Sequence, residues 1–129
     1  SHIASPIKMG LVEAIKADTD KSRVDLLDAE WLIGIGNVLR FGAKKYADHN
    51  WRRGFKYSRL IAAALRHLFA IMRREDIDPE SGLPHVHHLG CCIMFLSWHM
   101  KNKPELDDRW NSNVDTKVSE LDDRWKPTT

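Results

Sequence analysis

One short stretch, residues 75–88, brings together side chains that could bind a metal ion or a polyphosphate. Four carboxylates come first and three histidines follow, with Pro79, Gly82 and Pro84 between them. Mg²⁺ prefers carboxylate oxygens, whereas imidazoles are commoner ligands of transition metals. The stretch therefore predicts a divalent metal site, and a solvated acidic loop is the alternative interpretation. The candidate ligands are Glu75, Asp76, Asp78, Glu80, His85 and His88.

Two helices must flank this stretch and a third must precede them. Apolar residues at helical spacing predict a first helix from near Asp28, an N-cap residue, to Lys44–Tyr46. A second helix is predicted from Arg59 to about Arg74, capped by Ser58, and a third from Pro84 onward. Gly34 and Gly36 in the first helix predict close packing against a neighbour.

The second and third helices each carry a broad apolar stripe that predicts burial. In the second it comprises Leu60, Ile61, Ala64, Leu65, Leu68, Ile71 and Met72. In the third it comprises Val86, Leu89, Ile93, Leu96 and Met100. Outside these stripes, the spacing of His67 and Arg74 places them on one helix face directed at residues 75–88.

No stretch alternates with a period of two, so we expect an all-α fold. It should be a compact helical domain of three main helices with terminal helical segments. The expected organisation is an N-terminal arm (1–20), a helical domain (21–103) and a tail (104–129). Within the arm, residues 9–17 are expected to form one or two helical turns or a docking arm. The tail repeats the hexapeptide ELDDRW at 105–110 and 120–125.

Composition excludes several classes of function. A net charge of +2 is too small to indicate binding to nucleic acid or a membrane. No apolar run approaches the length of a membrane span, and no secretory leader is present. The adjacent Cys91 and Cys92 are expected to be reduced, as in a cytoplasmic protein. Large apolar helix faces predict a homodimer or higher homo-oligomer.

Several blocks of the sequence resemble a known phage family, the N-terminal domain of dATP/dGTP diphosphohydrolases. The resemblance spans residues 21–100 and is carried by KSRVDLL (21–27), FGAKKY (41–46), Asn50–Trp51, RHL (66–68) and EDIDPESGLPH (75–85). The layout is also loosely similar to all-α MazG-type nucleotide pyrophosphohydrolases, which bind magnesium through a Glu-x-x-Asp pair. Here that position reads His85-Val86-His87-His88.

The resemblance implies metal-dependent hydrolysis of a purine deoxynucleoside triphosphate to the monophosphate and pyrophosphate, for phage nucleotide-pool control in the host cytoplasm. His67 would act as general acid or base, with Glu75 and Asp78 as further catalytic residues. Trp51 would stack on the base and Asn50 would read its edge. The remaining substrate-binding candidates are Lys44, Lys45, Arg59, Arg66 and Ser81.

The histidines leave the metal open. Either the acids bind magnesium or manganese, or a softer metal such as zinc or iron is used, or no metal binds and His85 and His88 contact phosphates directly. Two other functions remain possible. One is a non-catalytic protein that sequesters a nucleotide or nucleotide-derived signal, countering host defence. The other is an adaptor that uses its tail to bind a host protein.

Overall fold

A computed structural model describes residues 12–112, and their architecture is all-α, as the sequence predicts. The long helices are α2 (Ala29–Lys45), α3 (Tyr57–Met72) and α4 (His85–Asn102). Short 3₁₀ helices are η1 (Val24–Leu26), η2 (Asn50–Arg53) and η3 (Pro104–Leu106). The predicted turns at residues 9–17 lie partly outside the described residues, and 12–17 have no regular secondary structure. No helix among the described residues is long and apolar enough to cross a membrane.

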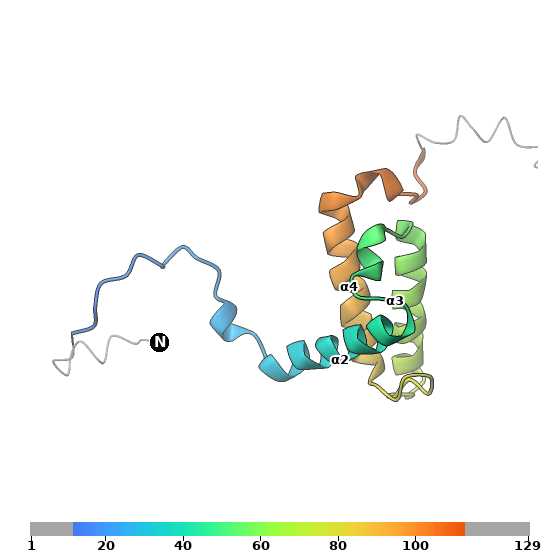
Figure 1. The fold of residues 1–129 in the computed structure, drawn as a ribbon, viewed down its shortest axis with the longest axis horizontal. Coiled ribbons are helices and arrows are strands. Elements are labelled where there is room, and N and C mark those ends of the chain that lie inside the picture. The colour runs from blue at the N-terminus through green and yellow to red at the C-terminus, as the bar shows by residue number, and fades with distance from the viewer. Residues whose placement is uncertain (1–11, 113–129) are drawn as a thin grey trace, which may run out of the picture.

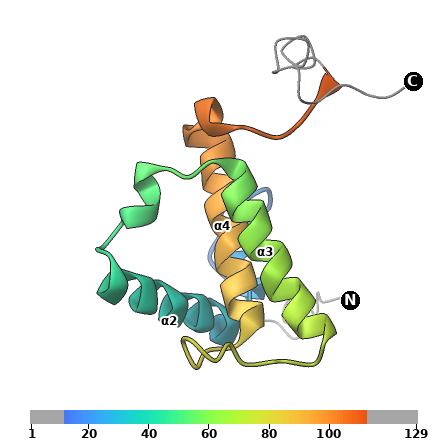
Figure 2. The same cartoon turned by 90° about the vertical axis from the view of Figure 1, so that its right-hand side faces the viewer.

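Helices α3 and α4 pack side by side as a hairpin, and α2 crosses α4 near the start of α4 (Figures 1 and 2). The start of α2 is capped as predicted, because the Asp28 carboxylate accepts a hydrogen bond from the Trp31 N–H. Gly34 allows the close approach of α2 and α4. A Cβ there would lie 2.3 Å from the His87 ring, whereas one at Gly36 would meet no atom within 4 Å. The prediction of close packing is therefore confirmed for Gly34 and wrong for Gly36.

The start of α3 differs from the predicted one. Its N-cap residue is Lys56, and Ser58 lies within the first turn. The capping oxygen comes from another segment: the Asp108 carboxylate accepts hydrogen bonds from the Ser58 N–H (2.8 Å) and from the Ser58 hydroxyl. The local sequence predicts Ser58 as the capping residue. Instead, the Asp108 carboxylate, fifty residues away, accepts the hydrogen bond from the exposed N–H group of Ser58.

Asp108 belongs to the first ELDDRW hexapeptide, which therefore packs on the α3 start. Leu106 fills the space beside Gly54, where a Cβ would lie 2.6 Å from the Leu106 Cδ1, and the Arg109 guanidinium lies over the Tyr57 ring. Arg109 also pairs with Asp107 at 2.8 Å and holds the pKa of that carboxyl at about 2. The second hexapeptide lies outside the described residues.

The α3–α4 connection, residues 73–84, is a folded hairpin rather than an open loop. Helix α3 ends at Met72 because Arg74 adopts a left-handed conformation, with φ +68°. The expected shared face of His67 and Arg74 is therefore wrong. The segment then closes through backbone hydrogen bonds from Asp78 N to Leu83 O and from His85 N to Asp76 O, both 2.9 Å. These bonds fix the carboxylates of the segment against the first turn of α4.

The buried core of the described residues is small. One cluster joins α2 to α4 through Ile35, Val38 and Cys91. Burial raises the pKa of the Cys91 thiol to about 12, which keeps it a protonated packing group. A second cluster surrounds His99, whose side chain is fully buried: its Nε2 accepts from the Phe55 N–H and its Nδ1 donates to the Phe95 carbonyl. His99 thus links the segment between η2 and α3 to α4 as a structural histidine.

Burial of the two apolar stripes is only partly as predicted. Leu60 is buried, and Ile61, Ala64 and Ile71 are half-buried. The remaining members of the α3 stripe are exposed, namely Leu65, Leu68 and Met72. Three members of the α4 stripe are also exposed, namely Val86, Ile93 and Met100. Helical periodicity marks an apolar face correctly, but it does not say whether the chain itself covers that face.

Candidate functional site

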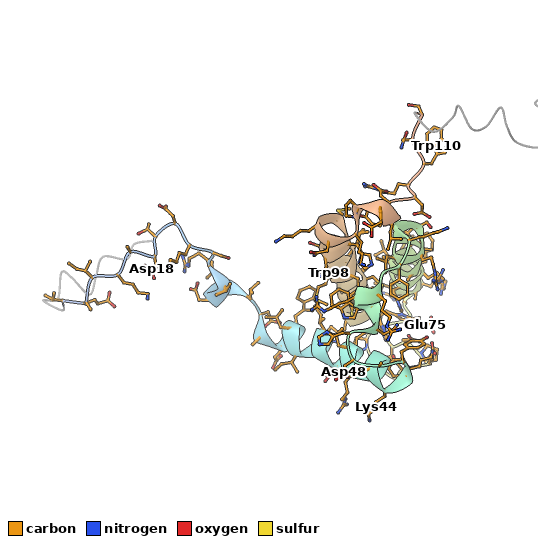
Figure 3. The ribbon with its side chains drawn as sticks, turned by 45° about the horizontal axis from the view of Figure 1, so that its top comes forward. Asp18, Lys44, Asp48, Glu75, Trp98 and Trp110 are labelled. Atoms are coloured by element: carbon orange, nitrogen blue, oxygen red, sulfur yellow. The ribbon has the colours of Figure 1, made fainter. Side chains whose placement is uncertain are left out.

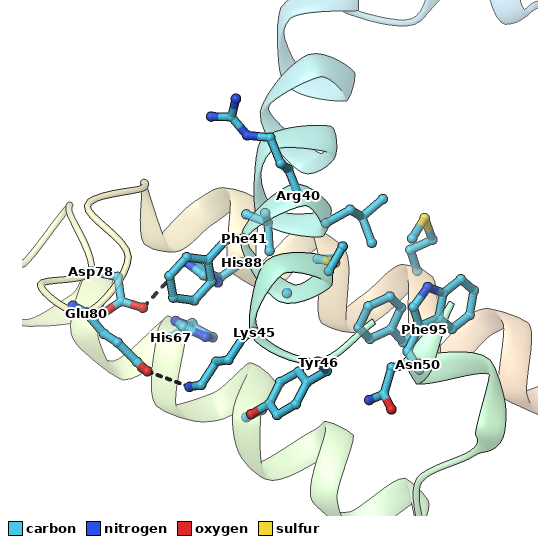
Figure 4. Close-up of a pocket in the computed structure, with 18 of the residues that line it drawn as sticks. Arg40, Phe41, Lys45, Tyr46, Asn50, His67, Asp78, Glu80, His88 and Phe95 are labelled. Atoms are coloured by element: carbon cyan, nitrogen blue, oxygen red, sulfur yellow. Dashed lines mark hydrogen bonds and ion pairs between the residues drawn. The ribbon is translucent and has the colours of Figure 1, made fainter. Parts of the chain in front are cut away.

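A cavity of about 1210 Å³ is lined by the second half of α2, by η2, by helices α3 and α4, and by the 73–84 segment that joins these two helices. It has two ends of different character, as Figure 4 shows. One end holds His67, His88, Asp78, Glu80 and Lys45, and the other holds Tyr46, Asn50 and Phe95. The volume exceeds that of many small-molecule sites, which hold about 300–1,000 Å³.

Three imidazoles meet at the first end of the cavity. The His67 and His88 rings are stacked with centroids 4.7 Å apart, and the His67 and His85 Nδ1 atoms lie 2.9 Å apart. His67 comes from the middle of α3, whereas His85 and His88 occupy the first turn of α4, one helical turn apart. Packing of α3 against α4 therefore assembles a cluster that neither helix could form alone.

The carboxylates of the site belong to the 73–84 segment. One Asp78 oxygen lies 3.4 Å from His88 Nε2, and the Ser81 hydroxyl lies 2.7 Å from the same nitrogen. Asp78 is 14% exposed and also accepts from the Glu80 N–H, so its position is fixed from two sides. Glu75 lies 3.6 Å from His85 Nε2.

Proton positions in the cluster follow from its hydrogen bonds. Only one of the two facing Nδ1 atoms of His67 and His85 can carry the proton they share. His85 Nε2 is buried without a hydrogen-bond partner, and the Glu75 carboxylate is the charge closest to it. A proton on His85 Nε2 is favoured beside this anion, which leaves His85 Nδ1 as acceptor and His67 Nδ1 as donor. His67 Nε2 is then left with a free lone pair.

The cluster fits a metal ion. His67, Asp78 and His88 can each offer one ligand atom, and these atoms all lie within 4.8 Å of one another. Two imidazoles and one carboxylate suit a transition metal better than magnesium. Burial and the neighbouring imidazoles lower the pKa of His67, and burial lowers the pKa of His88. Both rings are therefore neutral near pH 7, the form that binds metal.

The other predicted ligands differ in their surroundings. Glu80 pairs with Lys45 at 2.7 Å on the cavity wall, and this contact raises the pKa of Lys45. Glu75 and His85 also line the cavity, next to the three possible ligands His67, Asp78 and His88. Asp76 does not line the cavity, and its backbone carbonyl accepts from His85 N–H.

The predicted substrate-binding residues separate into two groups. Lys45, Asn50, Trp51 and Arg66 line the cavity, whereas Lys44, Arg59 and Ser81 do not. Lys44 is exposed and points away from the domain (Figure 3). The Arg59 guanidinium lies over the Phe55 ring, 5.3 Å from its centroid. The Ser81 hydroxyl contacts His88 Nε2.

Trp51 is packed into the cavity wall. Its ring stacks on Phe95 with centroids 4.5 Å apart, meets the edge of Trp98, and carries the Arg52 guanidinium 4.3 Å from its centroid. The neighbouring Tyr46 ring is 65% exposed and lines the same end of the cavity. Tyr46 is therefore the more accessible aromatic surface for a base.

Arg73 and Phe41 are among the cavity residues that the sequence reasoning missed. Arg73 lines the cavity together with Arg66, and its position seven residues after Arg66, directly after the end of α3, was a readable signal. Phe41 packs edge-on against His88 at 6.4 Å and carries Lys45 over its ring, 5.9 Å from the centroid. Its position four residues before Lys45 on α2 was the corresponding signal.

Comparison with known proteins identifies the family. Residues 13–109 match the model of a family described as "dATP/dGTP diphosphohydrolase, N-terminal". Over 101 residues, the chain is 37% identical to a Salmonella phage PMBT28 protein named dATP/dGTP diphosphohydrolase. The match covers 78% of this chain and 34% of the relative, so the chain spans about a third of that protein's length. No solved structure matches the chain. With a family match over most of its length and a 37% identical relative, the chain belongs to the dATP/dGTP diphosphohydrolase N-terminal family.

Proposed function

We propose that this cavity binds a purine deoxynucleoside triphosphate and that the protein hydrolyses it to the monophosphate and pyrophosphate. The observation that carries the proposal is the polarity of the cavity, with a histidine and carboxylate cluster at one end and aromatic and amide groups at the other. The name of the phage relative supports the reaction and the substrate class. The site lies in the N-terminal family region, where this chain and the relative match.

We assign the polyphosphate to the end beside α3. Arg66 lines the cavity from α3, Arg73 lines it from the residue that follows α3, and Lys45 lines it from α2. These cations would neutralise the triphosphate, and guanidinium groups can contact two phosphate oxygens at once. The base would lie at the other end, with Tyr46 as the stacking surface and Asn50 reading its edge. Trp51 would support this end through its contact with Phe95.

The proposed metal ligands are His67, Asp78 and His88, for a divalent transition metal such as Mn²⁺, Zn²⁺ or Fe²⁺. A metal bound there would polarise a phosphoryl oxygen and lower the pKa of a coordinated water. His85 would hold His67 in the tautomer with a free Nε2 lone pair, as outer histidine partners do in metal sites.

In hydrolysis a water oxygen forms a new bond to the α-phosphorus, the α–β bridging bond breaks, and pyrophosphate leaves. The water's proton needs an acceptor. His67 would be committed as a ligand, and Glu80 is held by Lys45 at 2.7 Å. Glu75 lines the cavity and its contacts with Arg73 (3.7 Å) and His85 (3.6 Å) are longer, so we assign the acceptor to Glu75. Glu75→Gln should then lower kcat by about 10²–10⁴-fold, the usual contribution of a general base, while metal binding persists.

The function is tested by incubating the purified chain with dGTP or dATP and with Mn²⁺, Zn²⁺, Fe²⁺ or Mg²⁺. Release of the monophosphate and pyrophosphate is followed by anion-exchange chromatography. The adjacent lysines provide a matched pair. Lys45→Gln should raise KM by about 10–100-fold, the loss of one charged hydrogen bond, and Lys44→Gln should leave it unchanged. Equal effects of the two substitutions would contradict the proposed site.

The outcomes also separate the alternative function. Nucleotide that binds in equilibrium dialysis but is recovered intact with every metal would favour the sequestering protein. The specific observation behind that alternative is that Asp78 is the single carboxylate in the three-residue ligand set. If the nucleotide neither binds nor is hydrolysed, both functions are contradicted.

A further inference from the structure

The face of α3 and α4 turned away from the cavity exposes apolar side chains from the second half of α3 and from positions along α4. Four exposed side chains come from α3, and three come from α4. They are Leu65, Leu68, Phe69 and Met72 on α3, with Val86, Ile93 and Met100 on α4. We name this set the back face.

Helical geometry places these residues on one continuous surface. At 100° per residue, the α3 members lie roughly opposite the residues of α3 that line the cavity, namely Ala63, Arg66, His67 and Ala70. The α4 members recur every seven residues and lie roughly opposite the cavity residues Cys91, Met94 and Trp98. Helices α3 and α4 pack side by side (Figure 1), so the two sets of side chains lie on adjacent helices.

Charge is absent from the back face. The two arginines of α3, Arg59 and Arg66, lie on other faces of that helix. The single lysine of α4, Lys101, lies in its last turn. The α3 members run from Leu65 to Met72 and the α4 members from Val86 to Met100, so the uncharged surface is about 10 Å long on α3 and about 21 Å long on α4. A surface of this kind in water is unfavourable unless another apolar surface covers it.

The exposed area is that of a protein interface. The seven side chains are between 42% and 73% exposed. Together they expose on the order of 700 Å² of apolar surface, whereas the largest apolar patch of a typical monomer is about 300–600 Å². A standard interface buries about 800 Å² on each partner. The back face alone nearly supplies this area.

We propose that the back face pairs with the same face of a second copy of this chain, forming a four-helix arrangement of two α3–α4 hairpins. A second copy is the favoured occupant because the back face is uniformly apolar and uncharged and can therefore pair with itself, as a two-fold interface requires. Each helix shows the spacing of a bundle helix with one buried stripe and one still uncovered. The two cavities would lie on opposite outer sides of the dimer, each open to substrate.

The test is the mass of the 129-residue chain in solution. Multi-angle light scattering at about 50 µM should give twice 14.9 kDa, which is 29.8 kDa. Leu68→Glu with Ile93→Glu should give the monomer mass, with the dimer dissociation constant raised at least about 100-fold, because two charges per chain enter the apolar interface. Both positions are half-exposed in the single chain, so circular dichroism should show an unchanged helical spectrum.

Asn37→Glu, an exposed position on α2, adds charge away from the back face and is the matched control. It should remain a dimer. Leu27→Glu tests the exposed apolar segment before α2, and loss of the dimer in this variant alone would overturn the back-face interface. A monomeric parent chain, or a back-face variant that stays dimeric, would overturn the proposal as well.

Discussion

At the scale of residues, the cluster of His67, His85 and His88 is defined by which ring nitrogens carry protons. Glu75 and Asp78 approach two of the rings from the 73–84 hairpin, at 3.6 Å and 3.4 Å. Each carboxylate favours a proton on the nitrogen that faces it, which leaves other nitrogens free to accept a proton or bind a metal. The chemistry of the site thus depends on a few side-chain orientations rather than on the number of histidines.

Stability should depend on pH through these histidines. Burial lowers the pKa of His67 and of His88 below the ordinary value of 6.5, so the unfolded chain takes up protons first as pH falls. The free energy of unfolding therefore decreases below about pH 6.5. In EDTA, Tm should be a few degrees lower at pH 5.5 than at pH 7.5. The double variant His67→Gln, His88→Gln should show a smaller difference, and an unchanged difference would contradict this origin.

At the scale of elements, the α2–α4 crossing depends on two glycines. Gly34 lies against the His87 ring, and Gly90 on α4 lies against Trp31, where an added Cβ would lie 2.6 Å from the ring. Both contacts are made by the first half of α2 and set its distance from α4, while its second half lines the cavity. A larger residue at either position would move α2 relative to the histidine cluster.

Two substitutions in α2 should have opposite effects. Gly36→Ala adds a Cβ into open space and should raise the free energy of unfolding by about 0.5–1 kcal/mol, since alanine favours the helix. Gly34→Ala should lower it by about 1–3 kcal/mol, because the His87 ring must move. Urea unfolding followed by circular dichroism measures both. The further substitution His87→Ala should recover part of the Gly34→Ala loss, and no recovery would contradict the steric explanation.

At the scale of the whole molecule, the elements that form the walls of the cavity are connected mainly through α4. Helix α2 contacts α4, η2 is linked to α4 through His99 and Trp51, and α3 packs along α4. The α4 helix is therefore the common support of every wall. Groups from α2 and α3 that face each other across the cavity, such as Lys45 and Arg66, would be joined by a bound polyphosphate.

A ligand that joins these walls should stabilise the whole fold. Binding to the native state alone, at a ligand concentration 100 times Kd, adds about 2.7 kcal/mol to the free energy of unfolding. Tm should then rise by about 10 °C or more, since about 4–8 °C corresponds to 1 kcal/mol in a domain of this size. Differential scanning fluorimetry with a nonhydrolysable dGTP analogue and Mn²⁺ tests this. Lys44→Gln should keep the rise, Lys45→Gln should reduce it, and identical shifts would argue against the cavity.

The amino-acid sequence by itself determined the three helices, the cap at Asp28, the family resemblance and the stretch of carboxylates and histidines. These features are set by local periodicity, capping and turn chemistry, which depend on neighbours along the chain. Tertiary structure alone decided that His67 joins Asp78 and His88, that Lys45 rather than Lys44 faces the cavity, and that Asp108 caps α3. It also decided that three members of each apolar stripe stay exposed. Such outcomes depend on contacts between residues far apart in sequence, which helical spacing does not encode.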